Sequence, residues 1–306
     1  MLFLGISLSE GTNILYEKLK KNRILKVAGA FDALSAKLVE LSNFDAVWAG
    51  SFAISATHAL PDASILTMTE FLSTASIMVD ACSIPIIADC DTGFGGPSNV
   101  SHLVKKYESA GIAAISLEDK IFPKQNSLLE DGKQELLSEK DFVAKLIAAK
   151  NAKTNSNFMI IARIEALIAG HGIKEALKRA TAYERAGADA ILIHSKKNNP
   201  DEVFEFCDTW NGNLPIIAIP TSYPTVTLDE LEKHNVKMVI YANQSLRAAH
   251  WAMTDHLNQL SKAKSLSEVK TNLTSMEDIF HLQEMYEIKK QESYIENNLK
   301  KLGYIN

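Results

Sequence analysis

Two stretches of this chain repeat one pattern: residues 107–117 read YESAGIAAISL and residues 183–193 read YERAGADAILI. Each stretch begins with the polar end of a helix, passes through a glycine and continues into a short run of apolar residues. Glycine suits the end of a helix because its backbone readily adopts the left-handed conformation required there. The repeat therefore predicts a helix–glycine–strand unit, with Gly187 placed where a helix ends.

The strand half of this unit occurs eight times along the chain. The runs are apolar throughout rather than alternating, which is typical of strands covered on both faces in a parallel sheet. Helix-like segments separate them, so the order predicts an α/β fold, a (β/α)8 TIM-type barrel. An open doubly wound sheet is the alternative, disfavoured because no glycine fingerprint follows the first strand. The predicted strands are Ile24–Phe31, Ala46–Ser51, Ile84–Asp91, Ala113–Asp119, Phe158–Ala166, Ala188–Ser195, Leu214–Pro220 and Val236–Asn243.

The 306 residues are expected to form a single domain with helical additions. Length alone permits two domains, but one α/β barrel occupies roughly 250 residues. We expect an N-terminal helix within 1–22, the barrel over 23–260 and a C-terminal helical extension over 261–306. Appended helices of this kind usually cover a barrel end or a neighbouring subunit, although the charged residues from Lys289 onward also suit a solvated tail.

Composition argues against several classes of function. The chain is 46% hydrophobic with a formal net charge of −5, and its basic residues form only short pairs such as Lys196-Lys197, so no nucleic-acid partner is expected. No run approaches the roughly 20 apolar residues of a membrane span, and no signal peptide is recognisable. Three cysteines without metal-type spacing (Cys82, Cys90 and Cys207) indicate a reduced, cytoplasmic protein.

Ionisable residues gather at the carboxyl ends of the predicted strands, where the active site of a barrel enzyme lies. Asp89 and Asp91 are two residues apart, so on a strand their side chains share one face while Cys90 points the other way. Glu118 ends the next strand. Acids at strand ends are often helix caps or ion-pair partners, but three close carboxylates repel one another, and Mg²⁺ with its preference for oxygen ligands relieves that repulsion.

Two further strands carry residues suited to an anionic substrate. Arg163 stands among apolar residues, and a buried guanidinium needs an anion, which is Glu165 or a carboxylate or phosphonate of the substrate. His194 follows three apolar residues, and a histidine in that position is more often structural than catalytic. Trp48, taken alone, is ordinary core packing.

A long polar loop follows the fourth predicted strand. It runs from Lys120 to Gln134 and places Lys124, Asn126 and Ser127 close to the carboxylates. Long loops in compact domains are usually functional and often serve as lids, although an ordinary surface loop is the plainer alternative. The lysine, asparagine and serine residues favour a lid that contacts an anion.

Four blocks of this sequence resemble those of the phosphoenolpyruvate mutases, within the isocitrate lyase superfamily. The most specific block is Glu118-Asp119-Lys120, five further residues, then Asn126-Ser127; the resemblance extends from about Val27 to about Leu260. It implies a Mg²⁺-dependent isomerase that interconverts phosphoenolpyruvate and phosphonopyruvate, forming the C–P bond of phosphonate biosynthesis. The other blocks are Asp89-x-Asp91-Thr92-Gly93-x-Gly95, Ala162-Arg163-x-Glu165-Ala166 and His194-Ser195-Lys196.

The resemblance also implies roles for individual residues. Asp89 would be the nearest ligand of Mg²⁺ (or of Mn²⁺ in its place), and Asp91 and Glu118 would hold metal-bound waters. Asn126, on a gating loop, would contact the migrating phosphoryl group. The implied catalytic residues are Asp62, Lys120, Asn126 and Arg163. The implied substrate-binding residues are Trp48, Gly50, Ser51, Phe52, Lys124, Asn126, Ser127, Arg163 and His194.

Members of this family are typically tetramers that exchange their last barrel helix between neighbours. The resemblance therefore implies a homotetramer arranged as a dimer of dimers. One position departs from the family pattern, which usually reads Trp-x-Ser-Gly, because this chain reads Trp48-Ala49-Gly50-Ser51. On a strand, that one-residue step would turn the hydroxyl of Ser51 to the other face, whereas backbone N–H donors would still serve the substrate.

Three alternatives to a mutase remain open. Phosphonopyruvate hydrolases resemble this chain but carry threonine where Asn126 stands. Carbon–carbon lyases of the superfamily, which act on 2-oxo or 2-hydroxy dicarboxylic acids, carry a Lys-x-Cys-Gly-His-type lid, and the loop of this chain has no cysteine. A non-catalytic barrel that serves as a binding protein is disfavoured because it would have no reason to retain costly buried charges such as Arg163.

Overall fold

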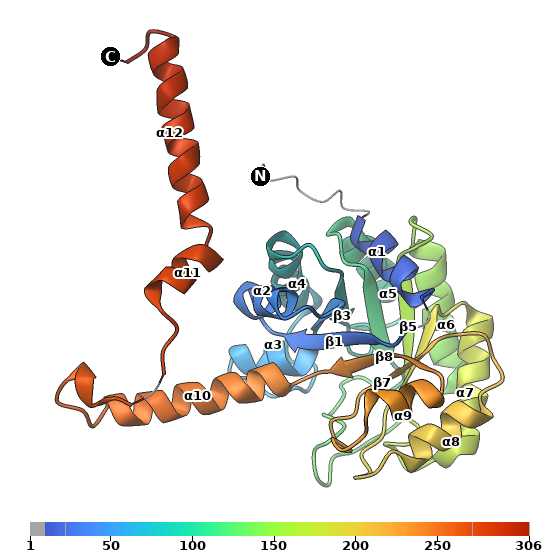
Figure 1. The fold of residues 1–306 in the computed structure, drawn as a ribbon. Helices are drawn as coiled ribbons and strands as arrows, with labels where there is room; N and C mark the ends of the chain where they lie inside the picture. Colours follow the sequence, from blue (N-terminus) through green and yellow to red (C-terminus); the bar gives the residue numbers. More distant parts are fainter. Residues whose placement is uncertain (1–9, 22, 271, 306) are drawn as a thin grey trace. The chain divides into compact units, whose positions relative to one another are not determined.

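The computed structural model describes residues 10–21, 23–270 and 272–305. A closed barrel of eight parallel strands lies at its centre, and the strands follow one another in sequence order (Figure 1). One strand lies within each predicted segment, so the prediction of a (β/α)8 barrel is confirmed. The strands are β1 (Leu25–Ala30), β2 (Ala46–Ala49), β3 (Ile86–Asp89), β4 (Ala114–Glu118), β5 (Met159–Ile164), β6 (Ala190–Ile193), β7 (Ile216–Ala218) and β8 (Val236–Tyr241).

Helices follow the strands and surround the barrel (Figure 1). Local sequence signals define their ends: the Thr67 and Thr227 hydroxyls cap the first turns of two helices, and α7 ends at Gly187, whose φ of 95° confirms the predicted left-handed residue. The helices are α2 (Ala33–Leu41), α3 (Ser51–Thr57), α4 (Met68–Ala81), α5 (Pro97–Ser109), α6 (Glu139–Ala152), α7 (Gly172–Ala186), α8 (Asp201–Thr209) and α9 (Leu228–Lys233).

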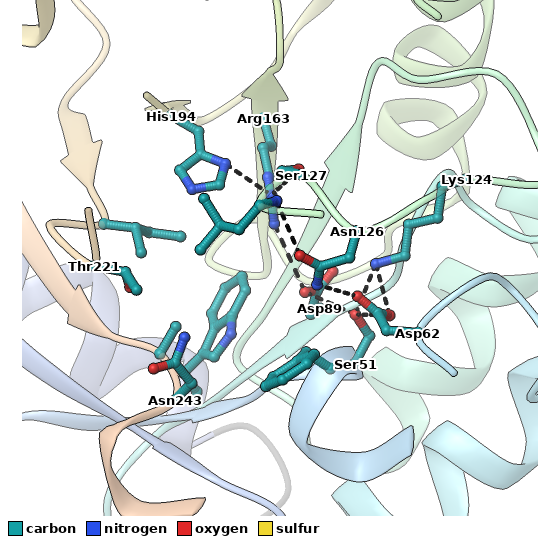
Figure 2. A pocket seen from close by; sticks show the side chains of 16 residues that line it. Ser51, Asp62, Asp89, Lys124, Asn126, Ser127, Arg163, His194, Thr221 and Asn243 are labelled. Carbon is teal, nitrogen blue, oxygen red and sulfur yellow. Dashed lines mark hydrogen bonds and ion pairs between the residues drawn. The ribbon is translucent and has the colours of Figure 1, made fainter. Parts of the chain in front are cut away.

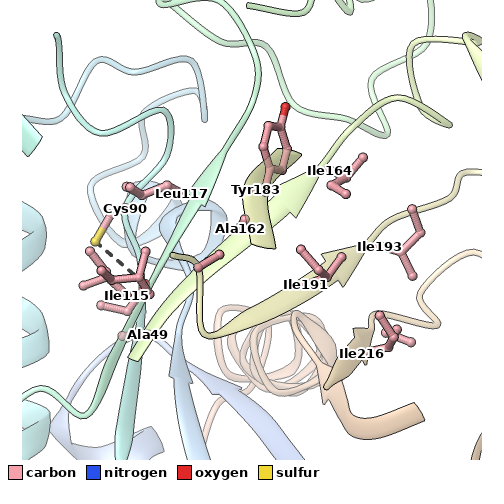
Figure 3. Packing of buried hydrophobic residues seen from close by; sticks show 14 of the residues in the cluster. Ala49, Cys90, Ile115, Leu117, Ala162, Ile164, Tyr183, Ile191, Ile193 and Ile216 are labelled. Carbon is pink, nitrogen blue, oxygen red and sulfur yellow. Dashed lines mark hydrogen bonds between the residues drawn. The ribbon is translucent and has the colours of Figure 1, made fainter. Parts of the chain in front are cut away.

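Two apolar layers enclose the strands. Outward-facing residues such as Ile115 and Ile193 pack against the helices, together with Tyr183 of α7 (Figure 3). Inward-facing residues such as Trp48 fill the barrel, and α1 (Glu10–Leu19) adds Leu15 to this inner layer. Burial of each large aliphatic side chain contributes about 1.5–3 kcal/mol. The two layers therefore provide a rigid frame for the strand ends.

The alternation of side chains along the strands turns particular charged groups into the barrel. On β5, Ile161 belongs to the inner layer and Arg163 follows it at the two-residue spacing of a strand. The same spacing turns Asp89 at the end of β3 and Glu118 at the end of β4 inward. These side chains meet at one end of the barrel because all eight strands are parallel.

Contacts within the chain define two compact units, Met1–Ala248 and Ala249–Asn306. Among the described residues of α10 (Gln244–Leu260), the short helix η1 (Leu266–Glu268), α11 (Met276–Leu282) and α12 (Met285–Lys301), none is buried. The predicted division into 1–22, 23–260 and 261–306 within one domain stays a prediction. Across residues 10–21, 23–270 and 272–305, every helix is too short or too polar to cross a membrane.

Candidate active site

A cavity of about 160 Å³ lies at the carboxyl ends of the strands. The loop after β4 reaches over it, and the side chains of Lys124 and Asn126 point from that loop toward Asp62 (Figure 2). Among the predicted site residues, Asp91, Glu118 and Lys120 do not line the cavity. Its lining residues are Trp48, Gly50, Ser51, Phe52, Asp62, Asp89, Lys124, Asn126, Ser127, Leu128, Arg163, His194, Ile219, Thr221, Ala242 and Asn243.

The Arg163 guanidinium is the centre of a buried polar network. Its Nε donates to Oε1 of Glu165 at 2.5 Å and its Nη2 donates to the Ser127 hydroxyl at 3.1 Å. Burial alone lowers the pKa of Arg163, but the carboxylates around it, Glu165 foremost, outweigh burial and hold the pKa far above its usual value. The remaining nitrogen, Nη1, lies 3.9 Å from Oδ2 of Asp89, so one edge of a permanently charged guanidinium is turned to the cavity.

His194 packs against the same network. Its Nδ1 lies 3.0 Å from Nη2 of Arg163 and 3.0 Å from Oε1 of Glu165, and the tautomer of the ring determines which contact is a hydrogen bond. Burial lowers the pKa of His194, and the neighbouring Glu165 only partly offsets this effect. The ring is therefore neutral at pH 7 and contributes a hydrogen-bonding group rather than a charge.

The two aspartates of the predicted carboxylate cluster are positioned by different local structures. Asp89 ends β3, and its Oδ2 accepts a 3.0 Å hydrogen bond from the Ser51 hydroxyl. Asp91 lies beyond the strand in a turn with a φ of 49°, so the prediction that strand alternation aligns it with Asp89 is wrong. The turn instead brings the Asp91 carboxylate to 2.8 Å from Nζ of Lys124.

The carboxyl group of Glu118 is buried and lacks hydrogen bonds. Neither of its carboxylate oxygens has a hydrogen-bond partner among the described residues, and Nε of Arg163 lies 3.5 Å from Oε2. Burial raises the pKa of Glu118 to about 7, against the opposing effect of Lys124 and Arg163. A buried carboxyl group without hydrogen bonds requires a further partner, such as a metal-bound water.

The positions of the carboxylate oxygens of Asp89, Asp91 and Glu118 decide whether the site suits Mg²⁺. In the part of the chain that the structure describes, no three Asp, Glu, His or Cys side chains converge as direct ligands of one ion. Mg²⁺ typically uses one or two carboxylates and fills its octahedron with water and substrate oxygens. Asp89 on the cavity wall, with the unsatisfied oxygens of Glu118 behind it, fits that mode of binding.

The loop after β4 is anchored inside the site through Lys124. Its Nζ lies 3.0 Å from Oδ1 of Asp62 and 3.1 Å from the Ser51 hydroxyl, in addition to its ion pair with Asp91. Burial lowers the pKa of this ammonium group, but the surrounding carboxylates, of which Asp91 contributes most, hold it well above its usual value. Asn126 adds a second anchor, because its Nδ2 donates to Oδ2 of Asp62 at 2.8 Å.

Lys120 lies behind the cavity rather than in it. Its Nζ donates to the Ser127 hydroxyl at 2.6 Å and to the Gln125 carbonyl at 2.9 Å, and it lies 3.3 Å from Oε2 of Glu165. These contacts fasten the inner turn of the loop. Lys120 does not line the cavity, and its catalytic role stays a prediction.

Ser51 reaches the cavity, contrary to the expectation from strand geometry. The strand β2 ends at Ala49, Gly50 precedes the first turn of α3, and the chain direction changes before Ser51. The alternation of side chains along a strand therefore does not predict the direction of the Ser51 side chain. Gly50 itself has little room, because a Cβ atom there would lie 2.9 Å from Cδ1 and Nε1 of Trp48.

Several residues of this site carried only a weak signal in the sequence. Glu165 was expected only as an ion-pair partner, yet it contacts Arg163, His194, Lys120 and Ser127. Other lining residues were not predicted as binding residues; their one signal was a position near a strand end or in the loop. They are Leu128, Ile219, Thr221, Ala242 and Asn243.

A closed parallel barrel with carboxylates, a buried arginine and a covering loop at its carboxyl end has the arrangement of an active site in a barrel enzyme. The model of the family described as "Phosphoenolpyruvate phosphomutase" matches residues 16–261, and the chain belongs to that family.

One phosphoenolpyruvate phosphomutase and one phosphonopyruvate hydrolase are about equally similar to this chain. The phosphoenolpyruvate phosphomutase of Tetrahymena pyriformis is 44% identical and aligns over 85% of this chain and 87% of its own. The phosphonopyruvate hydrolase of Variovorax sp. (strain Pal2) is 43% identical, over 87% of this chain and 92% of its own.

Two similar solved structures represent one enzyme of each activity. A phosphoenolpyruvate phosphomutase from Streptomyces platensis subsp. rosaceus superposes with a TM-score of 0.91 at 43% identity, covering 93% of this chain and 99% of its own. A phosphonopyruvate hydrolase in complex with oxalate and Mg²⁺ superposes with a TM-score of 0.87 at 39% identity, covering 92% and 98%. Family membership is therefore clear, while the choice between the two activities depends on the site.

Proposed function

We propose that this protein is a magnesium-dependent mutase that interconverts phosphoenolpyruvate and phosphonopyruvate. The observation that carries the proposal is the 2.8 Å hydrogen bond from Asn126 to Asp62, which holds the loop across the cavity. The family resemblance assigns Asn126 to the migrating phosphoryl group and gives the hydrolases a threonine there. A loop held closed over the substrate keeps water from a reactive phosphoryl group, which favours transfer over hydrolysis.

The proposed reaction breaks the P–O bond of phosphoenolpyruvate and forms a P–C bond at the methylene carbon of the same molecule. Phosphoryl transfer passes through a loose transition state, so catalysis consists mainly of positioning and charge stabilisation. Arg163 supplies a fixed cation with one edge toward the cavity, and the neutral ring of His194 lies beside it. Ser127 ties this arginine to the loop, so closing the loop and orienting the arginine are coupled.

Asp89 would hold Mg²⁺, with Asp91 and Glu118 behind it; the same oxygen donors also suit Mn²⁺. When bound, the ion supplies positive charge that stabilises the enolate oxygen of pyruvate. The buried carboxylates nearby keep their oxygens directed to the same end of the barrel, and Ser51 orients the Asp89 carboxylate through its hydrogen bond.

Asp62 is ionised in this arrangement. Burial raises its pKa, but Lys124 and the hydrogen bond from Asn126 outweigh burial and lower it. An ionised Asp62 can serve as a transient nucleophile toward phosphorus or as a wall of negative charge that confines the phosphoryl group. Mass-spectrometric trapping of a phosphoaspartate distinguishes these two roles.

Hydrolysis of phosphonopyruvate to pyruvate and inorganic phosphate is the second candidate function. It is supported by the 43% identity to a phosphonopyruvate hydrolase, which matches the similarity to the mutase. The difference between the two activities is access of water to the phosphoryl group, and Asn126 with the closed loop favours the mutase. A lyase activity is disfavoured because the loop carries no cysteine.

We also propose a cytoplasmic homotetramer, arranged as a dimer of dimers that exchange α10. In support, the described part of α10 exposes large apolar side chains, with Trp251 72% and Met253 63% exposed. Large apolar side chains exposed on one helix suit an interface with another subunit. Light scattering coupled to size-exclusion chromatography measures the mass directly, and a monomer would contradict this proposal.

Two linked assays test the proposed function. Phosphonopyruvate and Mg²⁺ are added with lactate dehydrogenase and NADH, with or without pyruvate kinase and ADP. A mutase oxidises NADH only when pyruvate kinase is present, because phosphoenolpyruvate must first be converted to pyruvate. Oxidation of NADH by lactate dehydrogenase alone would establish the hydrolase instead.

A further inference from the structure

A second buried ion pair lies behind the active site and has no part in the proposed reaction. Arg179 belongs to the buried face of α7, and its Nη1 lies 2.9 Å from Oδ2 of Asp119, the residue that follows β4. The Tyr183 hydroxyl, also on α7, donates to the same carboxylate oxygen at 2.7 Å. Neither Asp119 nor Arg179 lines the cavity. Burying an ionised pair is costly, so its position beside the site calls for an explanation.

The loop after β4 leaves the barrel and returns to it through a short antiparallel stem, formed by residues 119–121 and 135–137. Within this stem, the backbone N–H of Leu137 donates to the carbonyl oxygen of Asp119 at 2.9 Å. The part of the loop that covers the cavity lies between the two sides of the stem. The spacing of the two sides therefore determines where the covering part can lie.

Arg179 contacts both sides of this stem. Its Nη1 pairs with the Asp119 carboxylate on the outgoing side, and its Nη2 donates to the Leu137 carbonyl at 3.1 Å on the returning side. Its Nε is occupied by Glu175 of the same helix, at 2.8 Å. A guanidinium presents its donors in a rigid planar fork, so a single side chain can fix the distance between two segments of backbone.

The same aspartate connects the stem to the active site. Oδ1 of Asp119 accepts a 2.9 Å hydrogen bond from the backbone N–H of Glu165, which lies just beyond β5. The side chain of Glu165 in turn accepts a hydrogen bond from the Arg163 guanidinium at 2.5 Å. The Asp119 carboxylate therefore joins the base of the loop to the residue that orients Arg163.

We propose that Arg179 is a positioning residue that, together with Asp119, holds the stem in the geometry from which the loop closes over the substrate. The inference rests on the proposed function, in which the closed loop keeps water from the phosphoryl group. Arg179 acts through the stem and touches no reacting atom. A loosened stem lowers the population of the closed loop while the charged groups of the cavity stay in place, so kcat is affected more than KM.

Arg179→Lys tests this proposal, because it keeps a cation beside Asp119 but replaces the fork with a single ammonium group. Trypsin cleavage after Lys133, which is exposed in the loop, reports opening of the loop, whereas a general loss of structure also accelerates cleavage after Lys196, which is exposed beyond β6. We expect the ratio of the two rates to rise roughly 10-fold, the scale of one lost hydrogen bond to a charged group, and kcat to fall by a similar factor. KM for phosphonopyruvate should stay within about threefold of wild type. Glu175→Gln, which leaves both contacts with the stem, is the control and should alter neither value.

Tyr183→Phe is the second variant, and it decides the question if circular dichroism shows that Arg179→Lys does not fold. It removes one donor to Asp119 and keeps the ring, which packs against Phe142, so the cleavage ratio should rise by a smaller factor of roughly threefold. An unchanged ratio in both variants would overturn the proposal, and so would equal acceleration at both lysines or a raised ratio with unaltered kcat. Cleavage requires no turnover, so a wild-type protein inactive on phosphonopyruvate contradicts the proposed function alone, and the ratio still tests Arg179.

Discussion

Nδ2 of Asn126 lies 2.8 Å from Oδ2 of Asp62, and this hydrogen bond joins the loop after β4 to the segment between α3 and α4. The two residues are 64 positions apart in the chain, so the contact exists only when the loop lies over the cavity. Lys124 makes a second link to the same carboxylate at 3.0 Å. Asp62 is thus one of the carboxylates that hold the loop closed, together with Asp91 and Glu165.

Asn126→Asp is expected to open the loop. The change keeps the size of the side chain but sets a second carboxylate against Asp62, and close like charges repel. We expect kcat for phosphoenolpyruvate formation to fall roughly 100-fold, the scale of a misplaced catalytic group, and proteolysis within residues 124–134 to accelerate. Steady-state kinetics and timed digestion measure both effects. Glu130→Gln, an exposed change in the same loop, is the control and should leave both values unaltered.

Glu165→Gln is expected to weaken both the fold and the site. This carboxylate is fully buried and pairs with Arg163 and Lys120, and removing one partner of a buried ion pair costs about 3–5 kcal/mol. Urea unfolding measures the loss, and KM for phosphonopyruvate should rise because Arg163 loses its orientation. Lys178→Gln, which removes exposed ion pairs, is the control and should leave the unfolding midpoint unchanged. Equal stability of Glu165→Gln and wild type would refute the role assigned to this network.

Asp89→Asn is expected to abolish the response to Mg²⁺ while the fold persists. Removing a group that stabilises charge in a preorganised site typically lowers kcat roughly 100- to 1,000-fold. Calorimetric titration with Mg²⁺ should show binding to wild type and none to the variant, with unchanged circular dichroism. Asp229→Asn, at the exposed start of α9, serves as the control. Full activity of Asp89→Asn without added metal would contradict the metal assignment.

Gly50→Ala is expected to displace Trp48. The new Cβ atom would lie 2.9 Å from two atoms of the indole ring, and such overpacking typically costs about 1–3 kcal/mol. Because Trp48 lines the cavity, we expect KM for phosphonopyruvate to rise together with the loss of stability. Gly96→Ala is the matched control, since a Cβ atom there meets nothing within 4 Å. An unaltered KM and unfolding midpoint in Gly50→Ala would show that the ring moves freely.

Much of this architecture could be predicted from the sequence, for a physical reason. Strands covered on both faces need continuous apolar runs, so the eight strands were recognisable, and any charged residue among them stood out. Arg163 and Glu118 could therefore be singled out from the sequence alone as candidate site residues.

The remaining features depend on contacts that no local pattern encodes. The direction of Asp91 follows from a turn with positive φ, and that of Ser51 from a helix that begins one residue after the strand. Lys124 meets Ser51 across 73 positions of the chain. Thr221 and Asn243 carried no distinctive signal because neutral polar residues at strand ends are common.

The most direct test of the mutase proposal is a phosphorus NMR spectrum of the purified protein with phosphonopyruvate and Mg²⁺. We expect the phosphonate signal to give way to the signal of phosphoenolpyruvate, little inorganic phosphate to accumulate, and chelation of Mg²⁺ to stop the conversion. Inorganic phosphate as the main product would contradict the proposal, and would mean that the loop held by Asn126 admits water and that the enzyme is a hydrolase.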